Sequence, residues 1–173
     1  MQTENAVIVR RIRSGDWDSL RALRLAALKD APLAFGSTFA RENESAPLKW
    51  KNWALRGAAG NHETIYVAVN EPGQLVGMIG AYPEEERSHI WGMWVHPEYR
   101  GRGIGGELLD ILLSWLTSVR RAGDILLEVN AAQEPAVGLY RRHGFVLTGR
   151  TRPLGHHPPT VVQEMVWKPS DAV

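Results

Sequence analysis

The sequence predicts an α/β protein in which helices cover both faces of one mixed β-sheet. The 173 residues suit a single domain. No linker divides the chain, so we expect one domain over residues 1–173. Segments with the two-residue alternation of strands are interspersed with segments that have the 3.6-residue period of helices. The strand-helix-strand unit at 89–130 is expected to be a right-handed crossover between parallel strands.

The N-terminal third is predicted to contain one strand and two helices. Residues 6–12 are rich in β-branched side chains and form the first strand. Ser14 or Asp16 can cap the helix that follows. The buried face of this helix repeats apolar residues at helical spacing: Leu20, Leu23, Ala27 and Leu28. Residues 30–47 contain Pro, Gly and Ser and should be irregular or only briefly helical, and a second helix follows Pro47.

The middle of the chain is predicted to form three antiparallel strands followed by a long helix. Residues 64–70, 75–82 and 89–95 are β-rich, and polar turns separate them. The period then returns to 3.6 residues over 105–121, which indicates an amphipathic helix. The three strands are expected to belong to the central sheet, and the long helix is expected to cover one of its faces.

The C-terminal part adds three strands and a helix. Residues 124–130 form a short apolar strand, and 133–143 form a helix with a proline in its first turn and a glycine after its end. Residues 145–150 and 161–168 close the chain as strands, with a loop over 151–159 between them.

Composition excludes several classes of protein. The formal net charge of +1 argues against a protein built to hold nucleic acid, which needs a clustered basic excess. The absence of cysteine excludes disulfide scaffolds, iron–sulfur clusters and a thiol nucleophile. His96, His156 and His157 match no usual metal-ligand spacing, so we expect no metal. The start lacks an apolar signal region and no stretch is long enough to span a membrane, so we expect a cytoplasmic protein with no membrane partner.

The loop before the long helix contains the residues most informative about function. Gly101, Gly103 and Gly105 lie between a strand end and a helix start, where glycine lets backbone N–H groups approach a ligand. The helix N-terminus adds unpaired donors and the positive end of the macrodipole. Arg100 and Arg102 add charge. This pattern is typical of a pyrophosphate-binding site.

Two other interpretations of these glycines remain open. They fit the dinucleotide-binding pattern Gly101-x-Gly103-x-x-Gly106, although that pattern normally follows the strand directly and five residues intervene here. They could also serve only to make a tight turn from strand to helix.

Two motifs, taken together, resemble the GNAT family of acetyl-CoA-dependent N-acetyltransferases. The first is Arg100-x-x-Gly103-x-Gly105, which is similar to the family's acyl-CoA signature. The second is the helix-and-strand ending in which Ala136, Tyr140, Gly144 and Phe145 match A-x-x-x-Y-x-x-x-G-F. The close resemblance covers about residues 64–150. It implies the GNAT-like fold, with acetyl-CoA as cosubstrate and no metal.

The resemblance implies where acetyl-CoA binds. The strand before the loop separates from its neighbour in the family, so the backbone of Met93, Trp94 and Val95 is expected to meet the pantetheine arm. The pyrophosphate is expected on the backbone N–H groups of Arg100, Gly101, Arg102, Gly103, Ile104, Gly105 and Gly106. Many members carry Asn seven residues before the tyrosine, where it contacts the CoA arm. Here that position is Gln133, and Asn130 lies nearby.

The resemblance also implies two catalytic residues. Direct attack on the thioester needs a neutral amine, and only about one lysine-like amine in 2,500 is neutral at pH 7. Tyr140 matches the family's tyrosine and can protonate the leaving thiolate. Glu128 interrupts an apolar strand and matches a glutamate that some N-terminal acetyltransferases of the family place on this strand, so it is the best candidate for the base. Family members also draw a base from the region that corresponds to Glu84, Glu85 and Glu86. Alternatively, Tyr140 belongs only to the helix's apolar face, and Glu128 only to a structural ion pair.

The acceptor is expected to be a primary amine of a small molecule or peptide, and the protein a monomer or homodimer. Residues 33–45, 83–88 and 153–159 are free to line the acceptor side. The first two carry carboxylates that would attract a cationic amine and disfavour an acidic acceptor, unless these point to solvent and select nothing. These carboxylates are Glu42, Glu44, Glu84, Glu85 and Glu86. The competing functions are a non-catalytic acyl-CoA-binding regulator on the same fold and a dinucleotide-binding oxidoreductase.

Overall fold

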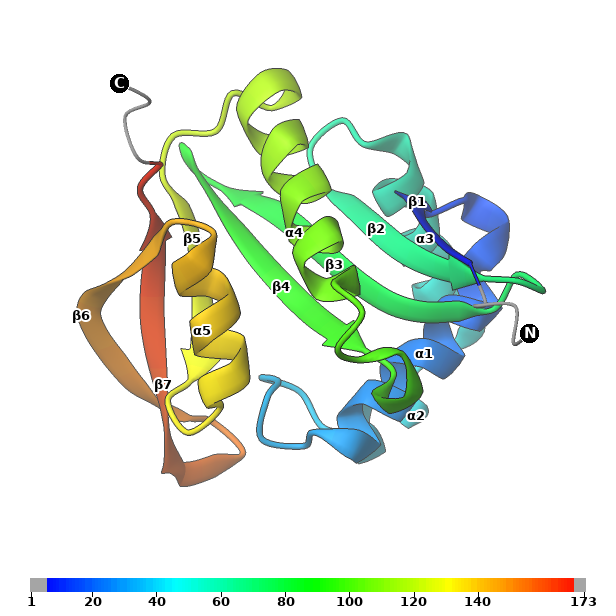
Figure 1. Ribbon diagram of the computed structural model, residues 1–173. Helices are drawn as coiled ribbons and strands as arrows, with labels where there is room; N and C mark the ends of the chain where they lie inside the picture. Colours follow the sequence, from blue (N-terminus) through cyan, green and yellow to red (C-terminus); the bar gives the residue numbers. More distant parts are fainter. Residues whose placement is uncertain (1–5, 170–173) are drawn as a thin grey trace.

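The computed structural model describes residues 6–169, which form a seven-stranded mixed sheet flanked by helices (Figure 1). The strands are β1 (Val7–Arg11), β2 (Thr64–Asn70), β3 (Leu75–Glu84), β4 (Arg87–Val95), β5 (Ile125–Asn130), β6 (Phe145–Leu154) and β7 (His157–Trp167). They are ordered β1-β2-β3-β4-β5-β7-β6 across the sheet. β4 and β5 run parallel, and the other neighbouring pairs are antiparallel. The predicted α/β class and mixed sheet are confirmed.

Helices cover both faces of the sheet. The α-helices are α1 (Trp17–Asp30), α2 (Phe39–Asn43), α3 (Pro47–Ala59), α4 (Ile104–Ser114) and α5 (Glu134–Arg142). Short 3₁₀ turns span Ser14–Asp16 and Pro97–Tyr99, and a π-helical segment spans Trp115–Val119. α1 and α3 lie behind the sheet in Figure 1, and α4 and α5 lie in front. No helix within residues 6–169 is long and apolar enough to cross a membrane.

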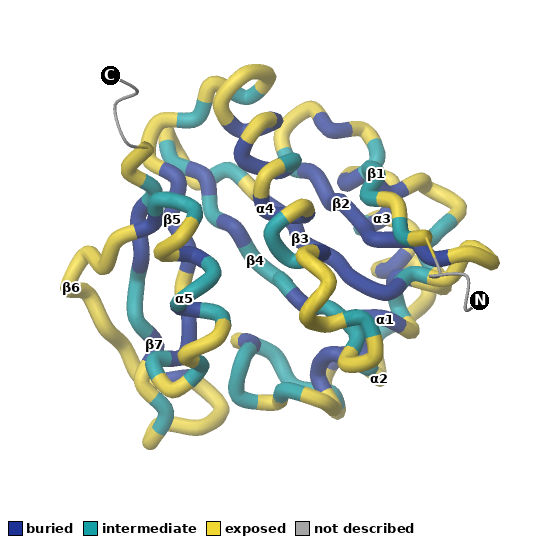
Figure 2. Tube along the Cα trace, in the orientation of Figure 1, coloured by how far each residue is buried: buried dark blue, intermediate teal, exposed yellow. Residues whose placement is uncertain are grey.

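A separate apolar core lies under each helical layer. Behind the sheet, Leu20 and Leu28 of α1 pack with Ile65, Val67 and Met78 of its strands. In front, the apolar faces of α4 and α5 pack on the alternate residues of the same strands. β2 is buried along its whole length, whereas most of β6 is exposed at the edge (Figure 2). The period-two pattern of the central strands therefore supplies both cores at once.

The structure differs from the sequence prediction mainly in the C-terminal hairpin. The predicted loop 151–159 is largely strand, because β6 and β7 pair as far as Leu154 and His157. Pro153 is tolerated because it lies on the edge strand β6. Pro158 and Pro159 precede Val162, where the pairing of β7 with β5 ends. The predicted helix 105–121 is also modified, because its last turn is π-helical from Trp115.

β4 and β5 separate part-way along their length. They pair only from Ser88 to Ile90 on β4, whereas β4 continues to Val95. A β-bulge in β4 accompanies the separation, because Trp91 and Trp94 lie opposite β3 residues only two positions apart. Gly92, in the bulge, has a φ of 70°, a conformation that favours glycine. The expected opening of the sheet is therefore present.

Candidate active site

A cavity of about 520 Å³ opens on the α1 side of the sheet, where β4 and β5 part. Its walls come from the α1–α2 connection, β4, β5 and the β6–β7 hairpin, and include Phe35, Trp91 and Glu128. His156 of the hairpin donates a hydrogen bond from Nε2 to the carbonyl oxygen of Phe35 over 2.8 Å. This contact joins two segments 121 residues apart. We call this cavity the cleft.

Glu128 lies in the wall of the cleft and is already paired. Arg152 of β6 donates from Nε to both carboxylate oxygens, over 2.9 and 3.0 Å, and Nη2 contacts one of them. This hydrogen bond raises the pKa of Arg152. The side chain of Glu128 keeps 38% of its surface exposed. Both interpretations of Glu128 therefore stay open, because it faces the cleft and also forms the ion pair.

Tyr140 lies on the other face of the sheet from Glu128. It is 7% exposed and belongs to the core beneath α4 and α5, and its ring meets Phe145 edge-on with centroids 5.8 Å apart. Burial raises the pKa of the Tyr140 hydroxyl well above its ordinary value, so the group holds its proton at neutral pH. Glu128 alternates with Leu127 and Val129, which face the core that contains Tyr140. The two predicted catalytic residues therefore approach the sheet from opposite sides.

The glycine-rich loop leaves the N-terminus of α4 uncovered. Gly101 and Gly103 have φ values of 75° and 79°, and a Cβ added at either would meet nothing within 4 Å. Gly103 is the N-cap residue, so the N–H groups of the first turn of α4 have no partner within the helix. These donors and the helix dipole suit an anion such as a pyrophosphate. The loop residues therefore fit the group that the sequence predicts.

Gly105 has a different role from the other glycines. A Cβ there would lie 3.3 Å from both Leu139 of α5 and Met93 of β4. Met93 and Val95 both pack against the α4–α5 core. Gly105 thus permits close packing of α4, α5 and β4 at the opening of the sheet.

The side chain of Arg100 is engaged away from the loop. Its Nε donates to the carbonyl oxygen of Val95 over 2.9 Å, and its Nη2 donates to Asp30 over 2.5 Å. Trp94 donates to the same oxygen of Asp30 over 2.9 Å. The guanidinium of Arg100, which was expected to add free charge to the loop, is therefore paired with Asp30 at the end of α1. Arg102 is exposed and donates to the carbonyl oxygen of Glu98.

The two predicted amide contacts lie apart from the glycine loop. Asn130 lines the cleft and donates from Nδ2 to the carbonyl oxygen of Leu33 over 3.2 Å, while its Oδ1 accepts from the backbone N–H of Ala132 over 2.9 Å. It thereby ties β5 to the segment after α1. Gln133 is the N-cap residue of α5, and its side chain makes no capping hydrogen bond.

The charges of the cleft differ from those that the sequence predicted. Glu42, expected to face the acceptor, is 4% exposed and paired with Arg24, so that expectation is wrong. Of the three glutamates at 84–86, only Glu84 lines the cleft. The lining holds four arginines and three glutamates: Arg24, Arg87, Arg150, Arg152, Glu84, Glu128 and Glu164. The cleft is therefore not predominantly acidic.

Sequence reasoning missed Arg24 and Arg152. Arg24 lies within the apolar stripe of α1, between Leu23 and Ala27. A charged residue at that position was a usable signal, because charge is costly on a buried face. Arg152 gave no such signal, because it lies in a segment where prolines suggested a loop.

Comparison with known proteins identifies the family. The profile of the "Acetyltransferase (GNAT) family" matches residues 21–145. The chain belongs to the GNAT family. Its glycine loop and the Tyr140 motif both fall within the matched range or at its edge.

Two curated relatives share about a third of the aligned residues. The chain is 34% identical over 87 residues to the peptidyl-lysine N-acetyltransferase YjaB of Escherichia coli, covering 50% of this chain and 52% of that protein. It is 35% identical over 109 residues to the N-alpha-acetyltransferase RimI of Mycobacterium tuberculosis, covering 60% of this chain and 65% of that protein. The matches thus span about half to two thirds of each relative's length.

Solved structures share the fold over nearly the whole chain. A GNAT acetyltransferase from Streptococcus pneumoniae superposes with a TM-score of 0.77 at 18% identity, covering 93% of this chain and 98% of that one. A spermidine N-acetyltransferase from Vibrio cholerae, in complex with CoA and spermine, has a TM-score of 0.73 at 17% identity, covering 92% and 94%. The GNAT fold is confirmed.

Replacing Asp30 with asparagine should destabilise the protein by about 1 kcal/mol at pH 7, because Asp30 joins Trp94 and Arg100 through partly exposed hydrogen bonds. These hydrogen bonds lower the pKa of Asp30, and the bond from Trp94 has the largest effect. A lowered pKa adds stability above the unfolded-state value, and this is lost as pH falls through the folded-state value. The difference from wild type should shrink below about pH 4. Urea unfolding at pH 7 and at about pH 2.5, below the ordinary pKa of Asp, measures it. A difference independent of pH would contradict the role of the charge.

Proposed function

We propose that the protein is an N-acetyltransferase that moves the acetyl group of acetyl-CoA to a primary amine of a small molecule or peptide. The observation that carries this proposal is the parting of β4 and β5 beyond Ile90. An uncovered helix N-terminus lies at the end of β4, and a cleft opens on the other side of the sheet. Two substrates can therefore reach one opening from opposite sides.

Acetyl-CoA supplies the activated acetyl group as a thioester. Its pyrophosphate would be held by backbone N–H groups from Gly101 to Gly106, where Gly101 and Gly103 leave the approach open. The backbone N–H of Arg100 already donates to the carbonyl oxygen of Pro97 over 3.3 Å. Its pantetheine arm would lie along the edge of β4 at Met93, Trp94 and Val95, which lack a partner strand on the β5 side. Asn130 and Gln133 are weaker candidates for contact with the arm, since Asn130 is already bound to Leu33.

An ammonium acceptor first loses one proton to a base, which leaves a neutral amine. The amine nitrogen then forms a C–N bond and the C–S bond breaks, and the second proton that nitrogen loses balances the one that the thiolate gains. Glu128 faces the cleft and would receive the amine proton, directly or through water. Tyr140 would donate to the thiolate, because burial keeps its hydroxyl protonated. The approach of the two residues from opposite faces suits these separate tasks.

The remaining features of the proposal rest on the sequence and the family. We place the protein in the cytoplasm as a monomer or homodimer, acting without metal, nucleic acid or membrane. The two curated relatives are named for acetylation of peptidyl-lysine and of the N-alpha group. Both names support an amine as the acceptor.

The decisive experiment combines ligand binding with turnover. The melting temperature should rise with acetyl-CoA and CoA but not with NAD or NADP. A ligand concentration 100-fold above Kd adds about 2.7 kcal/mol to the free energy of unfolding. Thiol release should then appear with some members of a broad panel of amines and peptides. Acetyl-CoA binding with no turnover on any acceptor would favour the non-catalytic regulator, and stabilisation by NAD alone would favour the oxidoreductase.

Replacing Gly103 with valine should weaken acetyl-CoA binding at least about tenfold, because a branched side chain would fill the open approach to the first turn of α4. Isothermal titration calorimetry measures the change. Gly73→Val is the matched control, since Gly73 also has positive φ and open space around its Cβ but lies in the β2–β3 turn. Unchanged affinity in Gly103→Val would overturn this placement of the pyrophosphate.

A further inference from the structure

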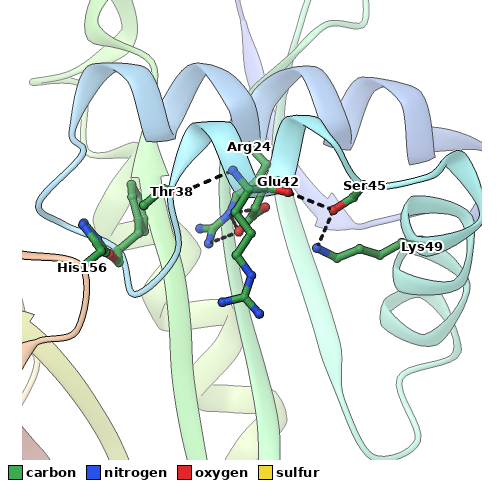
Figure 3. A network of polar contacts seen from close by, with 8 residues as sticks. Arg24, Thr38, Glu42, Ser45, Lys49 and His156 are labelled. Carbon is green, nitrogen blue, oxygen red and sulfur yellow. Dashed lines mark hydrogen bonds and ion pairs between the residues drawn. The ribbon is translucent and has the colours of Figure 1, made fainter.

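Arg24 is a buried cation with one nitrogen left unbound. It is 7% exposed. Its Nε donates to both carboxylate oxygens of Glu42 at 3.3 Å, and its Nη2 donates to one of them at 3.0 Å (Figure 3). Its Nη1 is buried and has no hydrogen-bond partner within residues 6–169. Both N–H donors of Nη1 are therefore unused.

The unused nitrogen is held at the opening of the sheet. The guanidinium lies against two aromatic rings, with its Cζ 4.7 Å from the centroid of Phe35 and 5.9 Å from that of Trp91. A Cβ built on Gly92, in the bulge of β4, would lie 3.9 Å from Nη1. Arg24, Phe35, Trp91 and Gly92 all line the cleft. Glu42 and the two rings thus fix the position of Nη1 before any acceptor arrives.

A fixed and unpaired donor is costly unless something binds it. A buried donor without a partner costs about 1–3 kcal/mol, and more if it is charged. Glu42 already balances the charge of Arg24, so the free edge of the guanidinium suits an oxygen that accepts hydrogen bonds. Carbonyl and carboxylate oxygens are such groups, and an ammonium group is not.

We propose that Arg24 determines acceptor specificity by donating a hydrogen bond from Nη1 to a carbonyl or carboxylate oxygen of the acceptor. The enzyme then selects amines that carry such an oxygen over amines that lack one. The proposal rests on the proposed transferase function. Arg87 and Arg150 also line the cleft, but so do Glu84 and Glu164. The selection therefore rests on the Nη1 donor of Arg24 and not on the net charge of the walls.

The test uses acceptors with and without a carboxamide or carboxylate beside the amine. Each acceptor is compared between wild type and variant, so the effect of that group on the basicity of the amine cancels. Tyramine, tyrosine amide and tyrosine form one matched set, and ethylamine, alaninamide and alanine form another. Arg24→Lys is the main variant, because lysine keeps a positive charge beside Glu42 but has one nitrogen where arginine has three. We expect its kcat/KM to fall about 10–100-fold with oxygen-bearing acceptors, mainly through KM, and less than about twofold with tyramine or ethylamine.

The ratio between matched acceptors separates recognition from a structural role. A structural defect lowers kcat/KM equally for all acceptors, so equal losses in Arg24→Lys would overturn the proposal. If that variant fails to fold, Arg24→Gln with Glu42→Gln removes both charges together and avoids an unpaired buried charge. Melting temperature and acetyl-CoA affinity report on folding. A larger loss with the amides indicates a peptide-like carbonyl, and a larger loss with the free acids indicates a carboxylate.

Failure of the transferase function gives a different result. If wild-type protein turns over no amine, the proposed function fails. Wild type and Arg24→Lys are then compared by calorimetry, which measures the equilibrium binding of tyrosine amide and of tyramine in the presence of CoA. Weaker binding of tyrosine amide alone in Arg24→Lys still supports the oxygen site. Equal affinities of each acceptor for wild type and variant overturn it.

Discussion

Replacing Tyr140 with phenylalanine should lower kcat about 10²-fold and leave acetyl-CoA affinity nearly unchanged. Phenylalanine keeps the ring and its edge-on contact with Phe145 but removes the hydroxyl, which burial keeps protonated by raising its pKa. General acid catalysis typically contributes 10²–10⁴-fold, and thiolate is already a good leaving group, so the lower end is expected. Steady-state kinetics with saturating acetyl-CoA measures the change.

Tyr66→Phe is the matched control for this substitution. Tyr66 is also 7% exposed and lies in the same core. Its hydroxyl accepts a hydrogen bond from Arg11, at the β1 side of the sheet. The control loses a buried hydroxyl far along the sheet from α5, so it should lose some stability and keep its kcat. An unchanged kcat in Tyr140→Phe, with chemistry shown to limit turnover, would return Tyr140 to a packing role.

The raised pKa of Tyr140 also has a consequence for the pH profile. The donor is active when protonated, so its activity is lost only as pH rises through its folded-state pKa. Because burial raises that pKa above the ordinary value of about 10, no loss of kcat attributable to Tyr140 should appear below about pH 10.

Local sequence pattern was sufficient to predict the order of elements. The β-branched and apolar residues of β2 reflect a strand buried on both faces, and the 3.6-residue stripe of α4 reflects a helix buried on one face. Both patterns are visible within a few neighbouring residues. The C-terminal hairpin was mispredicted for the opposite reason. Prolines at 153, 158 and 159 disfavour a strand locally, but the edge position that makes them tolerable depends on β5 and β7 pairing.

The geometry of the candidate site was predictable where a motif lies in consecutive residues. The glycine loop needs only its own backbone and the helix that it begins, so its geometry follows from the sequence. The pairings Arg24–Glu42 and Arg100–Asp30 join residues 18 and 70 positions apart. Such partners depend on how the elements pack, and they reversed two expectations: Glu42 does not face the cleft, and Arg100 does not offer a free charge to the loop.

Glu128 can serve as the general base or only as the ion-pair partner of Arg152. If it is the base, replacing it with glutamine should lower kcat/KM at pH 7 by about 10²-fold or more. Glutamine keeps the size of the side chain and an oxygen that can accept from Arg152. Most of the geometry of the ion pair is therefore retained, while the ability to take a proton is removed.

Glu164→Gln is the matched control for Glu128→Gln. Glu164 lies opposite Glu128 in the register of β5 and β7 and also lines the cleft, where it accepts a hydrogen bond from Thr148 over 2.9 Å. Both variants remove one carboxylate from the same wall, so a general electrostatic effect on the acceptor would be equal in the two. A base role predicts a large loss only in Glu128→Gln.

The pH dependence distinguishes the base from the ion pair. A base is needed because a lysine-like acceptor, with a pKa near 10.4, is almost entirely protonated at pH 7. Raising the pH to 9 increases the neutral fraction of the acceptor about 100-fold, so the defect of Glu128→Gln should shrink as solvent takes over the deprotonation. A structural defect would instead persist at both pH values, and Arg152→Gln, which breaks the same ion pair, would reproduce it together with a lower melting temperature. A loss in Glu128→Gln that is independent of pH and matched by Arg152→Gln would therefore assign Glu128 to the architecture of the cleft and leave the amine to be deprotonated by another group.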